Sequence, residues 1–124
     1  MRKIDTGASG EEKAATHLIK KGYKILTRNF KNYLGEIDII ASDKEVICFV
    51  EVRSRRGVLS HEDALRSIDS AKQRRLSRLA VSFLKERKFL DRRARFDVVS
   101  VSFRDAGCDV LLLKDAFPVD PDYS

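Results

Sequence analysis

Hydrophobic and polar positions along this chain follow two periods, one typical of helices and one typical of strands. Apolar residues recur at three- and four-residue intervals in two segments, which predict a first helix over 9–21 and a longer helix over 71–88. Runs rich in β-branched and aromatic residues predict strands over 23–30, 36–42, 46–54, 96–102 and 109–113, with a short helical stretch at 61–66. The order α-β-β-β-α-β-β predicts an α/β protein with a mixed sheet flanked by helices.

Both helices carry start signals and buried stripes. Ser9 with Glu12, and Ser70 with Gln73, have the spacing of capping boxes, and a glycine at 22 marks the end of the first helix. Glu11 shares the core-facing side of the first helix, so it is either a carboxylate that needs a partner or a charge that interacts with the helix dipole. The expected buried positions are Ala14, Ala15, Leu18 and Ile19 in the first helix and Leu76, Leu79, Ala80, Phe83 and Leu84 in the second.

Two consecutive strands bring acidic residues together. A hairpin centred between residues 44 and 45 places Asp38 opposite Glu51 and Glu36 opposite Arg53. Two carboxylates at about 5 Å repel by about 3 kcal/mol at an effective dielectric near 20, whereas a favourable cross-strand pair contributes only about 0.2–1 kcal/mol. Asp38 and Glu51 therefore predict a compensating divalent cation. Two simpler interpretations stay open: Glu36 and Arg53 form an ordinary ion pair, and Asp38 and Glu51 are solvated rim charges.

The alternation within this hairpin indicates where it is buried. One face is apolar or small throughout, and the other is apolar near the turn and charged at the open end. We therefore expect a hairpin that is buried on both faces near its turn and acidic at its open end. The first face comprises Ile37, Ile39, Ala41, Cys48, Val50 and Val52, and the second presents Ile40, Ile47 and Phe49 before the charged positions.

Length and composition favour one soluble globular domain. The chain has 124 residues, of which 43% are hydrophobic and 35% charged. The segment from Ala116 onward holds both prolines and is expected to be irregular, so we place one domain over 1–117 and a tail over 118–124. No apolar run has the length of a membrane span, and the first residues lack the apolar stretch of a signal peptide. Cys48 and Cys108 are too few for a disulfide framework, and we expect a cytoplasmic location.

Positive charge is concentrated in one part of the chain. The net charge is +6, and residues 72–95 alone carry ten basic against two acidic side chains. Such a concentration is typical of a surface that contacts a phosphate backbone, and it is also found on ordinary solvated helix faces. The expected nucleic-acid contacts are Lys72, Gln73, Arg74, Arg75 and Arg78.

The order of elements and acids resembles the restriction-endonuclease-like superfamily, the PD-(D/E)xK nucleases. The closer resemblance is to the YraN-like family, small bacterial proteins related in fold to archaeal Holliday junction resolvases. It extends from about Ser9 to Phe117. The residues that carry it are Gly10-Glu11, Ala14-Ala15, Leu18, Gly22-Tyr23, Arg28-Asn29-Phe30, Gly35 to Ile40, Phe49 to Arg53 with Arg55, Ala71 to Leu76, and Arg95 to Val99.

The resemblance implies roles for individual residues. Asp38 and Glu51 match the metal-binding acids and Glu11 the acid of the first helix, while Gln73 lies where related nucleases place a glutamine near the site. The family usually has lysine where this chain has Arg53. Arginine keeps its charge at any relevant pH and cannot act as a general base, although it can hold a phosphate.

Three functions remain to be distinguished. The first is a metal-dependent phosphodiesterase acting on DNA, in which Asp38, Glu51 and the backbone carbonyl of Val52 hold Mg²⁺ or Mn²⁺, Glu11 orders a metal-bound water and Arg53 contacts the phosphate. The second is a non-catalytic binder of branched or damaged DNA, and the third is a structural module with vestigial acids. A homodimer would suit a two-fold DNA junction, but no pattern fixes an interface. Neither histidine, at 17 or 61, lies beside a nucleophile motif that would indicate acyl transfer.

Overall fold

The computed structural model describes residues 6–57 and 61–118. Its described elements form a five-stranded mixed sheet in the order β1-β2-β3-β4-β5, in which β3 and β4 pair in parallel and the other neighbours are antiparallel. The expected α/β class, consistent with a restriction-endonuclease-like fold, is confirmed. The elements are α1 (Thr6–Lys20), β1 (Lys24–Asn32), β2 (Gly35–Asp43), β3 (Val46–Arg56), α2 (His61–Arg66), α3 (Ser70–Glu86), β4 (Ala94–Arg104) and β5 (Gly107–Phe117).

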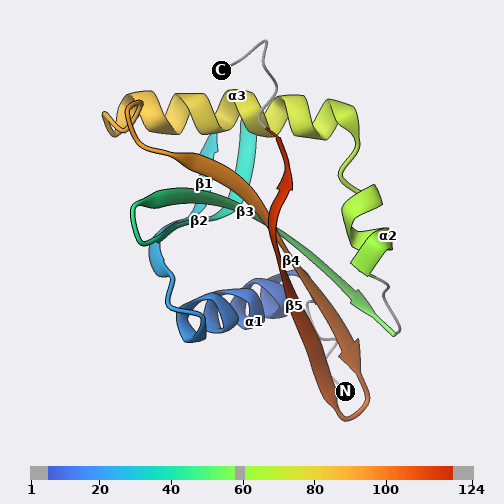
Figure 1. Ribbon diagram of the computed structural model, residues 1–124. Coiled ribbons are helices and arrows are strands. Elements are labelled where there is room, and N and C mark those ends of the chain that lie inside the picture. The colour runs from blue at the N-terminus through green and yellow to red at the C-terminus, as the bar shows by residue number, and fades with distance from the viewer. Residues whose placement is uncertain (1–5, 58–60, 119–124) are drawn as a thin grey trace.

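The sheet lies between two helices, with α3 on one face and α1 on the other (Figure 1). The crossover from β3 to β4 passes through α2 and α3, and this long connection allows the two strands to run parallel. The α3 layer is built on Leu76, Leu79, Ala80, Phe83 and Leu84, which confirms the expected stripe, together with Ile40, Ile47, Phe49 and Phe96 from the sheet. The α1 layer contains Ala14, Ala15, Leu18, Ile39, Ala41, Cys48 and Val50.

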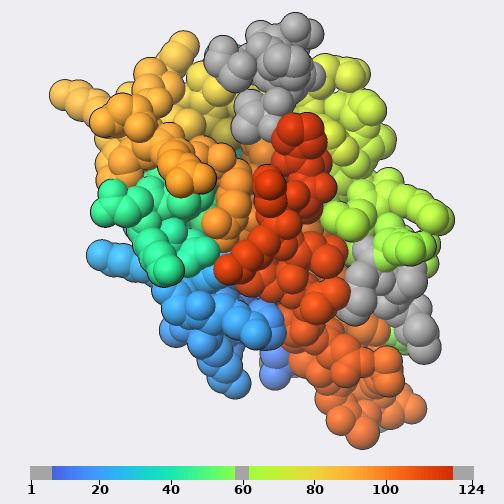
Figure 2. All heavy atoms as spheres, viewed as in Figure 1, coloured from blue at the N-terminus to red at the C-terminus, as the bar shows by residue number. Residues whose placement is uncertain are grey.

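The strand β5 forms one edge of the sheet and runs across the front of the molecule, where Figure 2 shows it in red. It continues to Phe117, so the expectation that the chain becomes irregular from Ala116 was wrong for these two residues. Pairing of Phe96 with Phe117 and stacking of the two rings, with centroids 4.7 Å apart, extend the strand. The rest of the expected tail, from residue 119, lies outside the described residues.

The helix starts differ from the sequence expectation. The helix α1 begins at Thr6, so Ser9 lies inside it, and Glu12 pairs with Arg28 at 2.7 Å instead of serving a capping box. The N-cap of α3 is Asp69, whose side chain accepts from the amide of Lys72 at 2.8 Å, so the capping box expected at Ser70 was also wrong. For α3 the residue just upstream of Ser70 provides the cap, which a spacing rule cannot reveal.

One residue of the buried stripe expected for α1 and one residue of the first hairpin face lie elsewhere. Ile19 is 59% exposed because the stripe of α1 that faces the sheet is narrow and ends at Leu18. Ile37 is buried, but it packs in the α3 layer instead of the α1 layer. Its partner in β1 is Phe30, which follows Asn29, a residue with a left-handed φ of 55°. This conformation interrupts the alternation of side chains and brings Phe30 and Ile37 under α3.

None of the helices within 6–57 and 61–118 combines the length and apolar composition needed to cross a bilayer.

Candidate active site

The candidate site lies where β2 and β3 separate. The expected register is confirmed from Asp43–Val46 to Ile39–Val50, where the described pairing ends. Beyond that point β2 stays paired with β1 as far as Gly35, while β3 continues beside β4 to Arg56. The expected pairing of Glu36 with Arg53 was therefore wrong, because the two strands have diverged before these positions.

Asp38 and Glu51 are the first residues beyond the last β2–β3 pair. The carboxylate of Asp38 accepts a hydrogen bond from the amide of Val52 at 2.9 Å, so the side chain satisfies a backbone donor at the point where the strands part. The side chain of Glu51 is only 5% exposed. Asp38 and Glu51 are hydrogen-bonded to each other through their side chains, which requires a proton on one of them. This burial contradicts the interpretation of Glu51 as a solvated rim charge, and Asp38 is half-buried.

Burial and the neighbouring charge of Glu51 raise the pKa of Asp38 to about 7, against an ordinary value of 3.8. The amide of Val52 and the ammonium of Lys72 act in the opposite direction and do not overcome these two effects. The acid pair therefore retains a proton close to neutral pH. A carboxylate pair that retains a proton near pH 7 is a site where a cation would find incompletely compensated negative charge.

Two basic side chains face Glu51. The ammonium of Lys72 lies 2.9 Å from Oε2 of Glu51, and the guanidinium of Arg53 lies 3.5 Å from the same oxygen. Arg53 thus pairs with the acid two residues before it, not with Glu36. Its Nε is buried and has no hydrogen-bond partner among the described groups, so the site contains a donor whose acceptor is missing.

A cavity of about 260 Å³ opens on this cluster between the sheet and α3. Its wall combines the acids with two basic residues and two leucines, so it has both charged and apolar parts. The lining residues are Gly35, Glu36, Asp38, Glu51, Lys72, Arg75, Leu76 and Leu79.

Glu11 approaches the same region from α1. Burial and the charge of Asp38 raise the pKa of Glu11 above its ordinary value, so the two acids influence each other. The amide nitrogen of Asn29, in the orientation that satisfies its hydrogen bonds, donates to Glu11 at 2.9 Å and to Glu36 at 3.0 Å. In the described part of the chain, no three His, Cys, Asp or Glu side chains form a group that could hold a metal ion by themselves.

The residues fit a magnesium-type site built on two carboxylates. Mg²⁺ usually keeps several waters and binds through one or two carboxylates, so Asp38 and Glu51 do not need a third acid in the first shell. Val52 contacts the pair through its amide N–H. The contribution of its carbonyl to a metal site stays a prediction, as does that of Glu11 to the ordering of a metal-bound water.

The basic residues of α3 separate into two groups. Lys72 points to Glu51, and Gln73 donates to the carbonyl of Ile68 at 3.0 Å, so both are engaged at the start of the helix. Arg74, Arg75 and Arg78 are exposed on the helix surface. Lys72 was expected only as a phosphate contact, and its place beside Glu51 depends on how α3 packs over β3. Its position three residues after the N-cap, with Arg75 one turn later, is the available sequence signal.

A comparison with known proteins identifies the family of this chain. The uncharacterised protein family UPF0102, which is the YraN-like family, matches residues 10–101. A UPF0102 protein of Syntrophus aciditrophicus is 43% identical over 92% of this chain and 89% of its own length. One from Caldicellulosiruptor saccharolyticus is 44% identical over 94% of this chain and its whole length, and one from Pelotomaculum thermopropionicum is 46% identical over 82% and 83%. The chain belongs to the UPF0102 family.

Proposed function

We propose that this protein is a divalent-metal-dependent endonuclease that hydrolyses phosphodiester bonds in DNA, including branched or damaged forms. The observation that carries the proposal is the pair of half-buried Asp38 and buried Glu51, which faces a cavity beneath a basic helix. An acid pair shielded from water lowers stability unless it is compensated, and here the ammonium of Lys72 and the amide of Val52 leave the pKa of Asp38 at about 7. Such a pair is expected where a cation is to be bound.

Asp38 and Glu51 would hold Mg²⁺ or Mn²⁺, with the carbonyl of Val52 as a further oxygen ligand. The ion, when bound, supplies a Lewis acid and lowers the pKa of a coordinated water. Glu11 would accept a hydrogen bond from a water on the α1 side of the pair. Arg53 would donate a hydrogen bond to a phosphate oxygen. Its buried Nε has no acceptor among the described groups, so a phosphate would supply one.

Lys72 supports an answer to the question raised by the arginine at position 53. Arginine cannot give up a proton at relevant pH, whereas lysine can. The ammonium of Lys72 is 2.9 Å from Glu51 and reaches the cavity from α3 instead of from β3. We therefore assign to Lys72 the proton-handling part of the lysine role and to Arg53 the electrostatic part.

The DNA backbone would lie along α3. Arg75 lines the cavity and is also exposed on the helix, next to Arg74 and Arg78. Neutralisation of phosphates by these side chains would give affinity without strong sequence preference. A non-catalytic DNA-binding protein that keeps the nuclease fold is the second candidate, because Arg53 replaces the lysine usual in the family.

The test is cleavage of linear, flapped and four-way DNA in Mg²⁺ or Mn²⁺ by the wild type, Asp38→Asn and Glu51→Gln. We expect the wild type to cut at least one form and each variant to lose cleavage while binding DNA as well or better, since negative charge near phosphate is removed. Glu12→Gln is the matched control, because this exposed acid is paired with Arg28 away from the cavity. It should cut like the wild type.

The result that overturns catalysis is a wild type that binds every DNA form and cuts none. The binding-module function would then replace it. Equal cleavage by the wild type and Asp38→Asn would instead remove the assignment of the site.

A further inference from the structure

Tyr33 has an unusual position for a large aromatic side chain. It is 94% exposed, more than any other large hydrophobic residue of the described chain. It occupies, with Leu34, the two-residue turn between β1 and β2. A single exposed aromatic side chain needs no functional explanation. Whether Tyr33 has a binding role therefore depends on the residues around it.

The turn that carries Tyr33 is fixed to α3. The side chain of Asn32 donates to the hydroxyl of Ser82 at 3.1 Å and accepts from the amide of Leu34 at 2.8 Å. Leu34 packs against the core beneath α3, and a side chain added at Gly35 would meet Leu79 and Arg75. The ring of Tyr33 is therefore exposed on a turn that is anchored on both sides, which lowers the entropy lost when a ligand packs against it.

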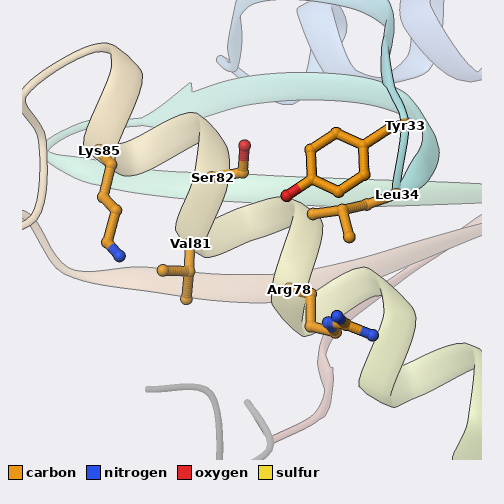
Figure 3. Close-up of a pocket in the computed structure, with 6 residues that line it drawn as sticks. All are labelled: Tyr33, Leu34, Arg78, Val81, Ser82 and Lys85. Atoms are coloured by element: carbon orange, nitrogen blue, oxygen red, sulfur yellow. The ribbon is translucent and has the colours of Figure 1, made fainter.

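Two open hollows flank this turn, and basic side chains line both. The first has a volume of about 400 Å³, and Figure 3 shows Tyr33 and Leu34 facing α3 with Arg78 and Lys85 to either side. The second, of about 370 Å³, is lined by Tyr33, Leu34, Ala71, Arg74, Arg75 and Arg78. Neither lining includes an acidic residue among the described positions. Arg75 also lines the cavity of Asp38 and Glu51, so basic residues connect that cavity with Tyr33.

We propose that Tyr33 is a stacking platform for an unpaired base of a DNA strand that follows α3 from the acid pair. This inference rests on the proposed function and specifies its substrate as DNA with a single-stranded segment. An exposed aromatic ring beside cations is the arrangement with which proteins bind single strands, because the ring stacks on a base while the cations contact phosphates. A paired base within a duplex has both faces stacked and offers the ring no surface.

The spacing along α3 fixes how far this base lies from the cut. Lys72 and Arg78 are six residues apart, which corresponds to about 9 Å along a helix axis. A strand stacked as in duplex DNA advances about 3.4 Å per nucleotide, so the unpaired base should lie about three nucleotides from the scissile phosphate.

The experiment measures binding by fluorescence anisotropy, with a chelator present to prevent cleavage. The ligands are a blunt duplex, the same duplex with a single-stranded flap, and that flap with abasic sites in place of its bases. Tyr33→Ala should weaken binding of the flapped DNA about five-fold or more, the effect of losing one stacked base. Tyr33→Phe should bind within about two-fold of the wild type. Leu90→Ala, which removes another exposed side chain, at 60% exposure, is the matched control.

The abasic flap separates stacking from a general loss of the surface. On this ligand, and on the blunt duplex, the wild type and Tyr33→Ala should bind equally. If Tyr33→Ala binds the intact flap as tightly as the wild type, or weakens all three ligands alike, the stacking inference is wrong while the proposed function stands. A wild type that binds none of the three ligands overturns both.

Discussion

Two acids on opposite faces of the sheet, Asp97 and Asp38, have different surroundings. Asp97 on β4 is completely buried, and its two oxygens accept from Tyr23, from Arg95 and from the amide of Asp115, each at 2.9 Å. Arg95 also forms an ion pair with Asp43, so a positive charge lies within this cluster. Asp38, on the other side, has one amide donor and a second acid as its neighbour.

The difference separates an acid that holds the fold together from one that is suited to bind a ligand. The cluster around Asp97 ties β4 to β5 and to the start of β1, and each of its donors and acceptors has a partner within the protein. Burial and the charge of Asp97 raise the pKa of Tyr23, which keeps its hydroxyl protonated as a donor. Around Asp38, burial and a like charge raise the pKa of the acid itself, which means that negative charge is only partly compensated. Burial of an acid alone therefore does not indicate a ligand-binding site. The chemical nature of the groups around the acid does.

The same substitution at the two acids should have opposite consequences for stability. Asp97→Asn removes the charge that faces Arg95 and should lower the free energy of unfolding by about 3 kcal/mol, the lower end for breaking a buried ion pair, because Arg95 keeps Asp43. Asp38→Asn resembles the protonated acid and should not destabilise the protein at pH 8. Urea denaturation measures both. Equal losses in the two variants would contradict the comparison.

The two cations beside Glu51 should also be separable by rate. Lys72→Arg keeps a positive charge near the acid but cannot give up a proton, so cleavage should fall tens-fold or more, about 2 kcal/mol. Arg53→Lys keeps the charge and should cut at least as fast as the wild type, because lysine is the residue that the resemblance to the nucleases implies at this position. Single-turnover cleavage at saturating protein separates rate from binding. Lys13→Ala, an exposed cation on α1, should cut normally.

Equal cleavage rates for Lys72→Arg and the wild type would contradict a proton-handling role for Lys72. They would leave Lys72 as a phosphate contact. A slower Arg53→Lys would show that the guanidinium itself, with its planar donors, is required.

The sequence was informative where local periodicity decides the structure. The register of the β2–β3 hairpin was predictable from its turn and its alternation, and the bounds of α2, His61–Arg66, agree with the expected stretch. The proximity of the Asp38 and Glu51 side chains followed from that register, although the strand pairing ends one position before them. The resemblance of the motifs to the YraN-like family added the class of fold.

The remaining features depend on contacts between distant segments. The left-handed conformation of Asn29, which brings Ile37 under α3, is not encoded by a glycine and could not be predicted from the alternation. Lys72 could be assigned to the site only after α3 was placed over β3. The separation of β2 and β3 after Ile39–Val50 also follows from their other neighbours, and for this reason the pairing of Glu36 with Arg53 failed.

The smallest expected effect is the dependence of stability on pH at Asp38. The folded protein holds a proton at this acid up to about pH 7, whereas the unfolded chain releases it near the ordinary value of 3.8. Between these values the folded state binds more protons, so the stability contributed by protonated Asp38 is complete below about pH 4 and is lost as the pH rises through 7. Asp38→Asn has no such loss. At pH 4 its free energy of unfolding should equal that of the wild type. Above pH 7 its free energy of unfolding should exceed that of the wild type by at least about 1 kcal/mol, since one pKa unit corresponds to about 1.4 kcal/mol. That gain corresponds to a difference of about 4 °C in Tm for a domain of this size.

Mg²⁺ or Mn²⁺ at pH 8 should raise the Tm of the wild type and not that of Asp38→Asn, because the ion offsets the charge that the substitution removes. Glu12→Gln, at an exposed carboxylate, should show neither effect. A difference between Asp38→Asn and the wild type that stays constant from pH 4 to pH 8 would mean that the acid pair is fully compensated within the protein, as Asp97 is, and would remove the main argument for a cation at this site.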